Sequence, residues 1–512
     1  MRALPRLLKR LWQQLPRSTA PVRLGLPWRM SLYSTLNGHH PLVASFVKGN
    51  SALLDSVVLN PYLLTDRSTV RGLQQRMSQH IRVISPEAGQ LMDWLNFSDQ
   101  LEIESQASHM DMLFLHTTPL YLGSLPWIFH FESFPTLFMP FLFHGNTTGV
   151  DLKATRFFQL TRDVLESPQC RRIFSHMHAS LNIMDHVFDS PLISSKLHHV
   201  PIGITIPPAV QSLEKYNQGK NLRILFTNSL HQDPQSFYLR GGHHLVEAFV
   251  RLRRRLPDIE LTVLSSMPND FAQRYSTDDL KGVNWIGTRV DDTTLEKLLL
   301  DHHLFALPTA GLHSYSFLRA ISHGCVPIVS DAPGYDEWIH GIEDSVLLIR
   351  GVRDLVYHRE PAGWFSDCYA PFIRHSEYFV QQIYDAVITH SRLSDLQQLA
   401  ERNIEHCGQH FSLEVSHATF NRRIELQEIL REGKPLPYEE ACLVEEHFHA
   451  HNIVRYLERY WGIPLALGHV DLMLEVDREK SGIISARYMT ELKERIVALD
   501  YSGWLMRQKD FK

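Results

Sequence analysis

Two predicted helix N-termini carry the residues of this sequence best suited to binding an anion. Arg240 precedes Gly241-Gly242, which open one helical pattern, and the segment LHSYS at 312–316 leads into another. A helix N-terminus offers free N–H groups and the positive end of the helix dipole. A guanidinium adds two-point binding of phosphate oxygens. The candidate anion-binding residues are Asn228, Ser229, Arg240, Gly241, His313, Ser314, Tyr315 and Ser316. The alternatives are a solvated cation at Arg240 and a plain helix cap at 313–316.

Histidine is the second residue type that could carry chemistry, since the chain has 30 of them. Adjacent pairs such as 198–199 and the run HFHAH at 447–451 raise the question of a metal site. Neighbouring side chains point apart on a regular element, and HFHAH would place its histidines on one face only as a strand. The surrounding residues are interpreted as a helix, so no metal site is predicted. His116 ends a strand-like run, where it would either reach a ligand or be a satisfied buried histidine.

Strand-like runs alternate with helical patterns between residues 221 and 349. Strands are expected at 222–227, 259–264, 283–287, 303–308, 325–331 and 345–349, with helices at 241–256, from 291, and at 316–324. The helices show an apolar period near 3.6, a possible Asp cap at 291 or 292, and a terminating Gly324. This alternation predicts a parallel sheet covered on both faces, with ligands at the carboxyl ends of its strands.

The first part of the chain also predicts an α/β domain, although less regularly. Strand-like runs occur within 80–89, 111–119, 125–133 and 170–177, and a helical pattern covers 154–167. The segment KLHHVPIGITIPP, at 196–208, is interpreted as an interdomain linker. The pattern is helical after residue 375 and mostly helical over the last eighty or so residues. The predicted segments are 1–39 (basic N-terminal segment), 40–205 (N-terminal domain), 206–375 (C-terminal domain), 376–430 (returning helices) and 431–512 (helical extension).

Composition narrows the class of protein and its surroundings. The 512 residues carry a net charge of -5, which gives no indication of a nucleic-acid partner. Five scattered cysteines without a CxxC pair favour a reduced, cytoplasmic location. No run of about 18 apolar residues predicts a membrane span. The first 29 residues mix seven arginines and lysines with leucines at helical spacing; this segment could lie on a membrane as a peripheral anchor, act as a transit peptide or be a frayed tail.

The stretch LPTAGLHSYSFLRAISHGCVPIVSDAPGYDEWI resembles the donor-site region of retaining glycosyltransferases of the two-domain GT-B type, family 4-like or group 1. Residues at the family's motif positions are Pro308-Thr309, Arg319-Ala320-Ile321-Ser322, Gly324, Pro327 and Glu337. LRILFTNS…RGGHHLVEAF, KLHHVPIGITIP and DMLFLH are similar to three further family segments. HSYSFLRA and GCVPI also resemble exostosin-like glycosyltransferases. The resemblance covers roughly residues 105–430.

The resemblance implies an α/β fold with two Rossmann-like domains facing across a cleft, followed by the C-terminal helical extension. It implies a hexosyltransferase that moves a sugar from a nucleotide-diphosphate sugar to a glycan, lipid-linked or small-molecule acceptor, with retention and no required cofactor. Arg319 and Glu337 join the anion-binding residues as donor contacts. His116 would contact the transferred sugar or position the acceptor. Glu132 stands where many relatives carry histidine and would orient an acceptor hydroxyl or act as base.

The sequence departs from the family at its paired glutamates, which are replaced by Gly311 and Arg319. An arginine cannot accept the ribose hydrogen bonds that the second glutamate accepts in the family. The alternative is therefore a catalytically inactive binding or scaffold protein with the same fold. A Rossmann oxidoreductase is disfavoured because no GxGxxG follows a predicted strand.

Overall fold

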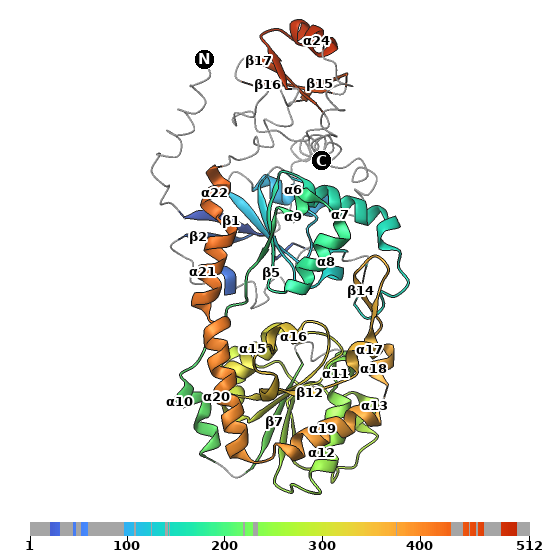
Figure 1. The fold of residues 1–512 in the computed structure, drawn as a ribbon, viewed down its shortest axis with the longest axis vertical. Coiled ribbons are helices and arrows are strands. Elements are labelled where there is room, and N and C mark those ends of the chain that lie inside the picture. Colours follow the sequence, from blue (N-terminus) through green and yellow to red (C-terminus); the bar gives the residue numbers. More distant parts are fainter. Residues whose placement is uncertain are drawn as a thin grey trace.

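The computed structural model describes residues 21–30, 45–47, 53–59, 97–106, 109–123, 125–138, 142, 144–218, 221–228, 234–374, 376–431, 444–449, 451–456, 459–464 and 483–498. These residues form two α/β domains and a small C-terminal α/β unit (Figure 1). The predicted strand at 80–89 and the basic, leucine-rich residues 1–20 lie outside the described residues.

The first domain is built on a six-stranded parallel sheet. In spatial order its strands are β2 (Leu54–Val58), β1 (Val22–Leu26), β3 (Met112–His116), β4 (Trp127–His130), β5 (Cys170–Ser175) and β6 (Leu197–His199). β1 corrects the interpretation of residues 1–39 as one basic segment, because it pairs with both β2 and β3. Its signal was the alternation of Val22, Leu24 and Leu26, which bury their side chains while Arg23 stays exposed.

Short helices complete this domain. They are α6 (Phe97–Ser105), α7 (Arg156–Glu166), α8 (His178–Phe188) and α9 (Pro191–Ser194). α7 begins where Thr155 accepts a hydrogen bond from the Phe158 amide, as an N-cap residue does. Its apolar face packs against the aromatic core of the domain, so the helix predicted at 154–167 is confirmed.

The second domain repeats the plan, and all six of its predicted strands are present. Their order is β12 (Leu347–Ile349), β11 (Val326–Ser330), β10 (Leu304–Leu307), β7 (Arg223–Thr227), β8 (Glu260–Leu264) and β9 (Val283–Trp285), all parallel. The helices are α10 (Ala209–Leu213), α11 (Pro234–Leu239), α12 (Gly242–Leu252), α13 (Asn269–Ala272), α14 (Asp292–Asp301), α15 (Ser314–Ser322), α16 (Tyr335–Trp338), α17 (Val352–Val356), α18 (Ala370–Ile373) and α19 (Glu377–Thr389). Asp291 caps α14 by accepting from the Thr294 amide, as its sequence indicated.

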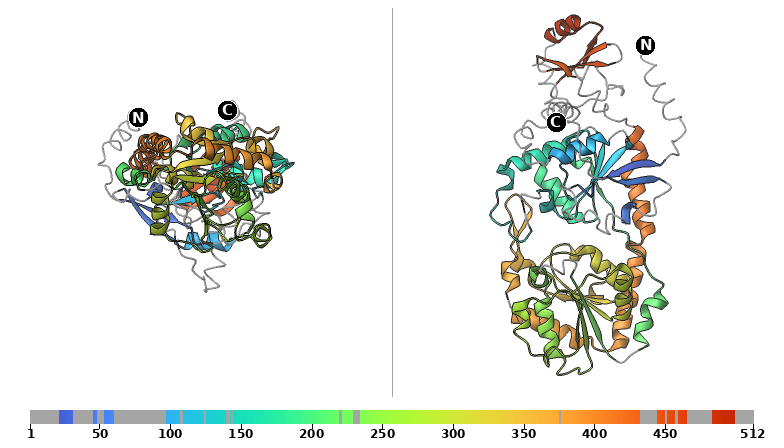
Figure 2. Two further views of the ribbon diagram at one scale, coloured as in Figure 1. Left: turned by 90° about the horizontal axis from the view of Figure 1, so that it is seen from below. Right: turned by 180° about the vertical axis from the view of Figure 1, so that it is seen from behind.

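The chain then returns from the second domain to the first. α20 (Leu393–His410) lies along the second domain, while α21 (Leu413–Ile424) and α22 (Leu426–Arg431) lie along the first (Figures 1 and 2). Phe420 of α21 packs on Phe174 of β5 with ring centroids 5.6 Å apart. On the other side of the molecule, the hairpin of β13 (Tyr357–Arg359) and β14 (Phe365–Asp367) reaches from the second domain to the first. The two domains are thus joined on both sides.

The C-terminal region corrects the expectation of a mostly helical extension. Its described residues form an antiparallel sheet of β15 (Val444–Phe448), β16 (His451–Tyr456), β17 (Arg459–Pro464) and β18 (Ile484–Ala486), followed by α24 (Met489–Val497). Within HFHAH, interpreted as helical, Phe448 ends β15 and pairs with His451 at the start of β16, and His449 has a φ of 44°. Ile453 and Ala486 of this sheet are buried against Leu492 and Ile496 of α24, and this core requires the alternation of a strand rather than a helical period.

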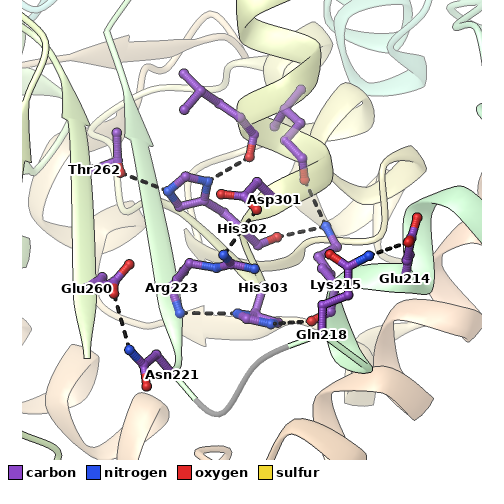
Figure 3. Close-up of polar contacts among 12 residues, drawn as sticks. Glu214, Lys215, Gln218, Asn221, Arg223, Glu260, Thr262, Asp301, His302 and His303 are labelled. Atoms are coloured by element: carbon purple, nitrogen blue, oxygen red, sulfur yellow. Dashed lines mark hydrogen bonds and ion pairs between the residues drawn. The ribbon is translucent and has the colours of Figure 1, made fainter. Parts of the chain in front are cut away.

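The amino edge of the second sheet is fixed by a buried polar cluster (Figure 3). The Lys215 ammonium donates to the carbonyl oxygens of Leu299, His302 and His323 at 2.8, 2.7 and 2.9 Å. His303 accepts from the Arg223 amide through Nδ1 at 3.2 Å, and its Nε2 lies 3.2 Å from the Lys215 carbonyl oxygen. These contacts satisfy the carbonyls that end α14 and α15 and leave the opposite edge of the sheet for ligands.

No helix in the described ranges is long and apolar enough to cross a membrane.

Candidate functional site

The two predicted anion-binding loops lie against each other at the carboxyl edge of the second sheet. The Ala310 amide donates to the Leu239 carbonyl at 2.8 Å, which joins the loop after β10 to the turn before α12. Gly241 has a φ of 75°, and a Cβ there would lie 2.2 Å from the Pro308 carbonyl oxygen. Only glycine permits this close approach. The N-termini of α12 and α15 are therefore brought to one place.

Arg240 is buried in this junction, with 6% of its surface exposed. Burial lowers the pKa of Arg240 to about 10, while the nearby Tyr335 hydroxyl acts in the opposite direction. The guanidinium is still charged at neutral pH. An anion bound beside it would offset the cost of keeping this charge away from water. The buried position disfavours the alternative of a solvated surface cation.

α15 points its first turn at the other domain. His313 is the N-cap residue and makes no side-chain cap bond, whereas the Ser314 hydroxyl donates to Glu132 Oε1 at 2.8 Å. Ser316 lies half-buried in the same turn, and burial raises the pKa of the half-buried Tyr315. The first residue of the helix that follows β10 thus bonds to a residue just beyond β4, so the carboxyl edges of the two sheets face each other.

Asn228, by contrast, is engaged within its own domain. Its amide nitrogen donates to Ser265 Oγ at 3.1 Å, and its side-chain oxygen accepts from Ser236 Oγ at 2.7 Å. These bonds tie the ends of β7 and β8 to α11 in this structure. Ser229 lies outside the described residues, and its role stays a prediction.

Arg319 faces away from the junction, toward α14. Its Nη1 donates to Asp292 Oδ1 at 3.1 Å, and Nη2 lies 3.9 Å from Glu296 Oε1. The arginine that replaces the family's ribose-binding glutamate is therefore paired with two carboxylates on the neighbouring helix. The contact of Arg319 with a nucleotide-sugar donor remains a prediction from the sequence.

Glu337 lies at the contact between the domains. Its two carboxylate oxygens accept from the amides of His178 and Ala179, both at 2.7 Å, and so cap α8 of the first domain. A carboxylate at a helix N-terminus is favoured by both the free amides and the helix dipole. Glu337 joins the two domains in this structure, and its contact with a donor stays a prediction.

The first domain contributes His116 and Glu132, together with two histidines that the sequence analysis did not single out. His116 ends β3, His130 ends β4, and His176 directly follows β5. All three side chains are at most 3% exposed. We call them the three-histidine row. The sequence contained a signal for this row, because the apolar part of three predicted strands is followed by a histidine at or next to its end (FLH, IFH and FSH).

Hydrogen bonds join the three histidines to one another, and a longer contact leads from the last of them to Glu132. His116 Nδ1 lies 2.9 Å from His130 Nδ1, and His130 Nε2 lies 3.1 Å from His176 Nδ1. His176 Nε2 lies 3.8 Å from Glu132 Oε1. The row ends at the carboxylate that Ser314 binds from the second domain. In the part of the chain that the structure describes, no group of three or more His, Cys, Asp or Glu side chains is arranged to hold a metal ion.

Two facing α/β domains with six-stranded parallel sheets form the GT-B arrangement. Residues 222–357 match the family described as "Glycosyl transferases group 1". This segment holds both anion-binding loops, so the family match falls on the part of the second domain that forms the candidate site. No curated protein sequence matches the chain.

Several solved structures are similar to this chain at low sequence identity. An α,α-trehalose 6-phosphate synthase from Burkholderia multivorans is 11% identical with a TM-score of 0.47, over 80% of this chain and 99% of that one. The Anabaena protein HepE, solved with UDP, is 11% identical with a TM-score of 0.46, over 79% and 99% of the two chains. A UDP-forming α,α-trehalose-phosphate synthase from Burkholderia vietnamiensis is 10% identical with a TM-score of 0.45, over 71% and 85%.

Proposed function

We propose that this protein is a glycosyltransferase that moves a sugar, of the hexosyl type, from a nucleotide-diphosphate donor to a hydroxyl acceptor. The observation that carries the proposal is the Ser314–Glu132 hydrogen bond. It brings the helix N-terminus and Arg240 of the second domain within reach of the acid–base groups of the first. The group 1 family match over residues 222–357 supports the same reading.

The second domain supplies what a diphosphate leaving group needs. Cleavage of the bond between sugar and phosphate adds one negative charge to a diphosphate that already carries two, and preorganised N–H groups and cations stabilise that charge as it develops. The N-termini of α12 and α15 and the Arg240 guanidinium converge on one place. Removing one such donor in other enzymes slows catalysis by about 10²–10³-fold. No metal is assigned a role, and activity should persist in the presence of a chelator.

The first domain would receive the acceptor. Glu132 is 29% exposed at its side chain and is held by Ser180, whose hydroxyl donates to the Glu132 carbonyl at 2.6 Å. Glu132 and His116 are the groups able to take a proton from an acceptor hydroxyl. Retention at the sugar, a glycan, lipid-linked or small-molecule acceptor and a cytoplasmic, peripherally membrane-bound location belong to the same proposal, as the family resemblance and the basic N-terminus suggest.

A binding or scaffold protein is the second candidate, and Arg319 is the observation that favours it. Its pairing with Asp292 and Glu296 puts a guanidinium at the family position that otherwise accepts ribose hydroxyls. A scaffold would keep the fold and the interdomain bonds without needing a nucleotide.

A thermal-shift screen with UDP, GDP, ADP, CMP and their sugar conjugates separates the two candidates. A ligand that binds only the folded state raises Tm by mass action. We expect one nucleotide series to raise Tm in the wild type and in Arg255→Met, an exposed control, but not in Arg240→Met. Turnover would then be measured with that series. No shift in the wild type with any donor would overturn the glycosyltransferase proposal.

A further inference from the structure

The three-histidine row has a fixed hydrogen-bond direction that follows from counting protons. The ring of His130 uses Nδ1 toward His116 and Nε2 toward His176. A neutral imidazole has one N–H and one lone pair, so His130 donates one of these bonds and accepts the other. The same polarity therefore runs through the row from one end to the other. Two directions are possible, and each assigns a tautomer to all three rings.

Burial keeps the central ring neutral. His130 is fully buried, with the rings of Phe46 and Phe174 at 5.1 and 5.0 Å from its own centroid. A charged imidazolium between two aromatic rings away from water is disfavoured. His130 is therefore a neutral ring with one N–H donor and one lone-pair acceptor.

The carboxylate of Glu132 determines which of the two hydrogen-bond directions the row adopts. Its Oε1 accepts from the Ser314 hydroxyl at 2.8 Å and faces His176 Nε2 at 3.8 Å. A carboxylate oxygen is attracted to an N–H and repelled by a nitrogen lone pair, so His176 carries its proton on Nε2. His176 Nδ1 then accepts from His130 Nε2–H. His130 Nδ1 in turn accepts from His116 Nδ1–H, which leaves the lone pair of His116 on Nε2.

We propose that Glu132, acting through His176 and His130, sets His116 as the Nδ1–H tautomer, so that its Nε2 accepts a hydrogen bond from a sugar hydroxyl. His130 and His176 are positioning residues in this scheme. If the hydroxyl proton is transferred to His116 Nε2, the Nδ1 proton passes to His130 and the His130 Nε2 proton to His176. The His176 Nε2 proton passes to Glu132 once the 3.8 Å separation from Oε1 closes to hydrogen-bond distance. All three rings end neutral, and one proton arrives on the carboxylate.

The location of that carboxylate gives the relay a use, and this step rests on the proposed function. Glu132 is bonded to Ser314 in the first turn of α15, where the leaving diphosphate is proposed to bind. A proton taken from the acceptor would thus arrive beside the group that gains negative charge. The row joins the two halves of the reaction through the interior of the first domain, without exposure to water.

The tautomers can be measured without any substrate, so this test is independent of the proposed function. In protein labelled with ¹⁵N-histidine, the nitrogen shifts distinguish a protonated from an unprotonated ring nitrogen. His116→Gln, His130→Gln and His176→Gln assign the three signals. We expect His116 to be protonated on Nδ1, and His130 and His176 on Nε2. An Nε2–H tautomer at His116 in the wild type would overturn the proposal.

Glu132→Gln tests what sets the direction. The carboxamide can present an N–H to His176 Nε2, which permits the opposite polarity, so the His116 signal should move toward the Nε2–H tautomer. Glu166→Gln is a control at a carboxylate on α7. An unchanged His116 tautomer in Glu132→Gln, with an unchanged Tm, would show that the carboxylate does not control the row.

His130→Phe tests the relay once a donor is known. Phenylalanine keeps the contacts with Phe46 and Phe174 but breaks both N···N bonds. We expect kcat to fall about 10²-fold, as it does when general base assistance is lost, with little change in the donor KM. The solvent deuterium isotope effect on kcat should change as well, because the proton transfers of the relay no longer occur. His303→Gln, at another buried histidine in the second domain, should keep kcat. Equal kcat values in His130→Phe and wild type would exclude the relay.

Discussion

Gly241 shows how one residue without a side chain shapes the proposed donor site. Alanine there would meet two costs: a φ of 75°, and a Cβ 2.2 Å from the Pro308 carbonyl oxygen. The left-handed conformation alone costs about 1–2 kcal/mol, and relieving the collision would move the two loops apart. We expect Gly241→Ala to lower the free energy of unfolding by about 3 kcal/mol and to weaken nucleotide binding, as measured by urea unfolding and by thermal shift.

Gly149 offers a matched control. Its φ is 77°, but a Cβ there would meet nothing within 4 Å. Gly149→Ala therefore isolates the cost of the backbone conformation, about 1–2 kcal/mol. Equal losses in the two variants would show that the close approach to Pro308 is not needed.

At the scale of elements, Lys215 joins the C-termini of α14 and α15. Its ammonium satisfies three buried carbonyl oxygens, those of Leu299, His302 and His323. Lys215→Met keeps the aliphatic stem but leaves the carbonyls without this donor, and each buried unsatisfied group costs about 1–3 kcal/mol. We expect a loss of about 3 kcal/mol or more in urea unfolding. Lys297→Met, at an exposed position of α14, should change stability by less than about 0.5 kcal/mol.

The same cluster makes the second domain sensitive to acid. Burial lowers the pKa of His303 to about 4, and the charges of Arg223 and Lys215 act in the same direction. Protonation at Nδ1 would set an N–H against the Arg223 amide that donates to it. Because the unfolded histidine has a pKa near about 6.5, the unfolded state binds the proton first as pH falls. The contribution of His303 is complete above about pH 6.5 and is lost progressively toward pH 4.

His303→Gln tests this dependence, since glutamine retains one donor and one acceptor but does not titrate. Tm should fall less steeply between pH 6.5 and 4 in the variant than in the wild type. His302 and His323, whose pKa values are also lowered by burial, retain part of the slope. His340→Gln, at an exposed histidine, should follow the wild-type curve. Parallel curves for His303→Gln and wild type would contradict the assignment.

The elements that could be predicted from the sequence are those whose signal is local. The strands of the second sheet are continuous apolar runs, and α14 starts at an Asp cap, so both were predicted correctly. β1 was missed because its five residues lie among arginines. The strands within 444–464 were missed because their charged residues also fit a helical pattern. Pairing between the strands favours the strand over the helix, and this pairing cannot be read from the local sequence.

In the candidate site, too, the residues that could be predicted are those whose signal is local. Helix N-termini and Arg240 follow from local spacing, whereas the partners of a side chain depend on distant segments. The sequence indicated neither that Arg319 meets Asp292, 27 residues away, nor that Glu132 meets Ser314, 182 residues away. The three-histidine row depends on the spatial order β3–β4–β5, which brings three strand ends together.

At the scale of the whole molecule, two sets of polar contacts hold the domains together at separate places. At one, Glu337 caps α8 and Ser314 donates to Glu132. At the other, Asp367 of the β13–β14 hairpin accepts from the Thr147 hydroxyl at 2.6 Å and lies 3.0 Å from His144 Nδ1. Burial alone would raise the pKa of Asp367, but the bonds from His144 and Thr147 hold it below its ordinary value. Both contact sets must open if the domains are to separate for substrate entry.

Hydrogen exchange can follow one contact set at a time. The amides of His178 and Ala179 lie in the first turn of α8, where a helix has no carbonyl partners of its own. Glu337→Ala removes the carboxylate that accepts from them, and a lost cap of this kind is worth about 1 kcal/mol. Exchange at these two amides should therefore become roughly 5-fold faster, while the Thr147 amide, which donates to the Asp367 carbonyl, keeps its rate. Glu343→Ala, whose carboxylate accepts from the nearby Gly341 amide, is the control and should leave α8 unchanged. If the α8 amides exchange equally fast in wild type and Glu337→Ala, the domains already separate at this contact in solution, and closure must depend on the Asp367 contacts and the returning helices.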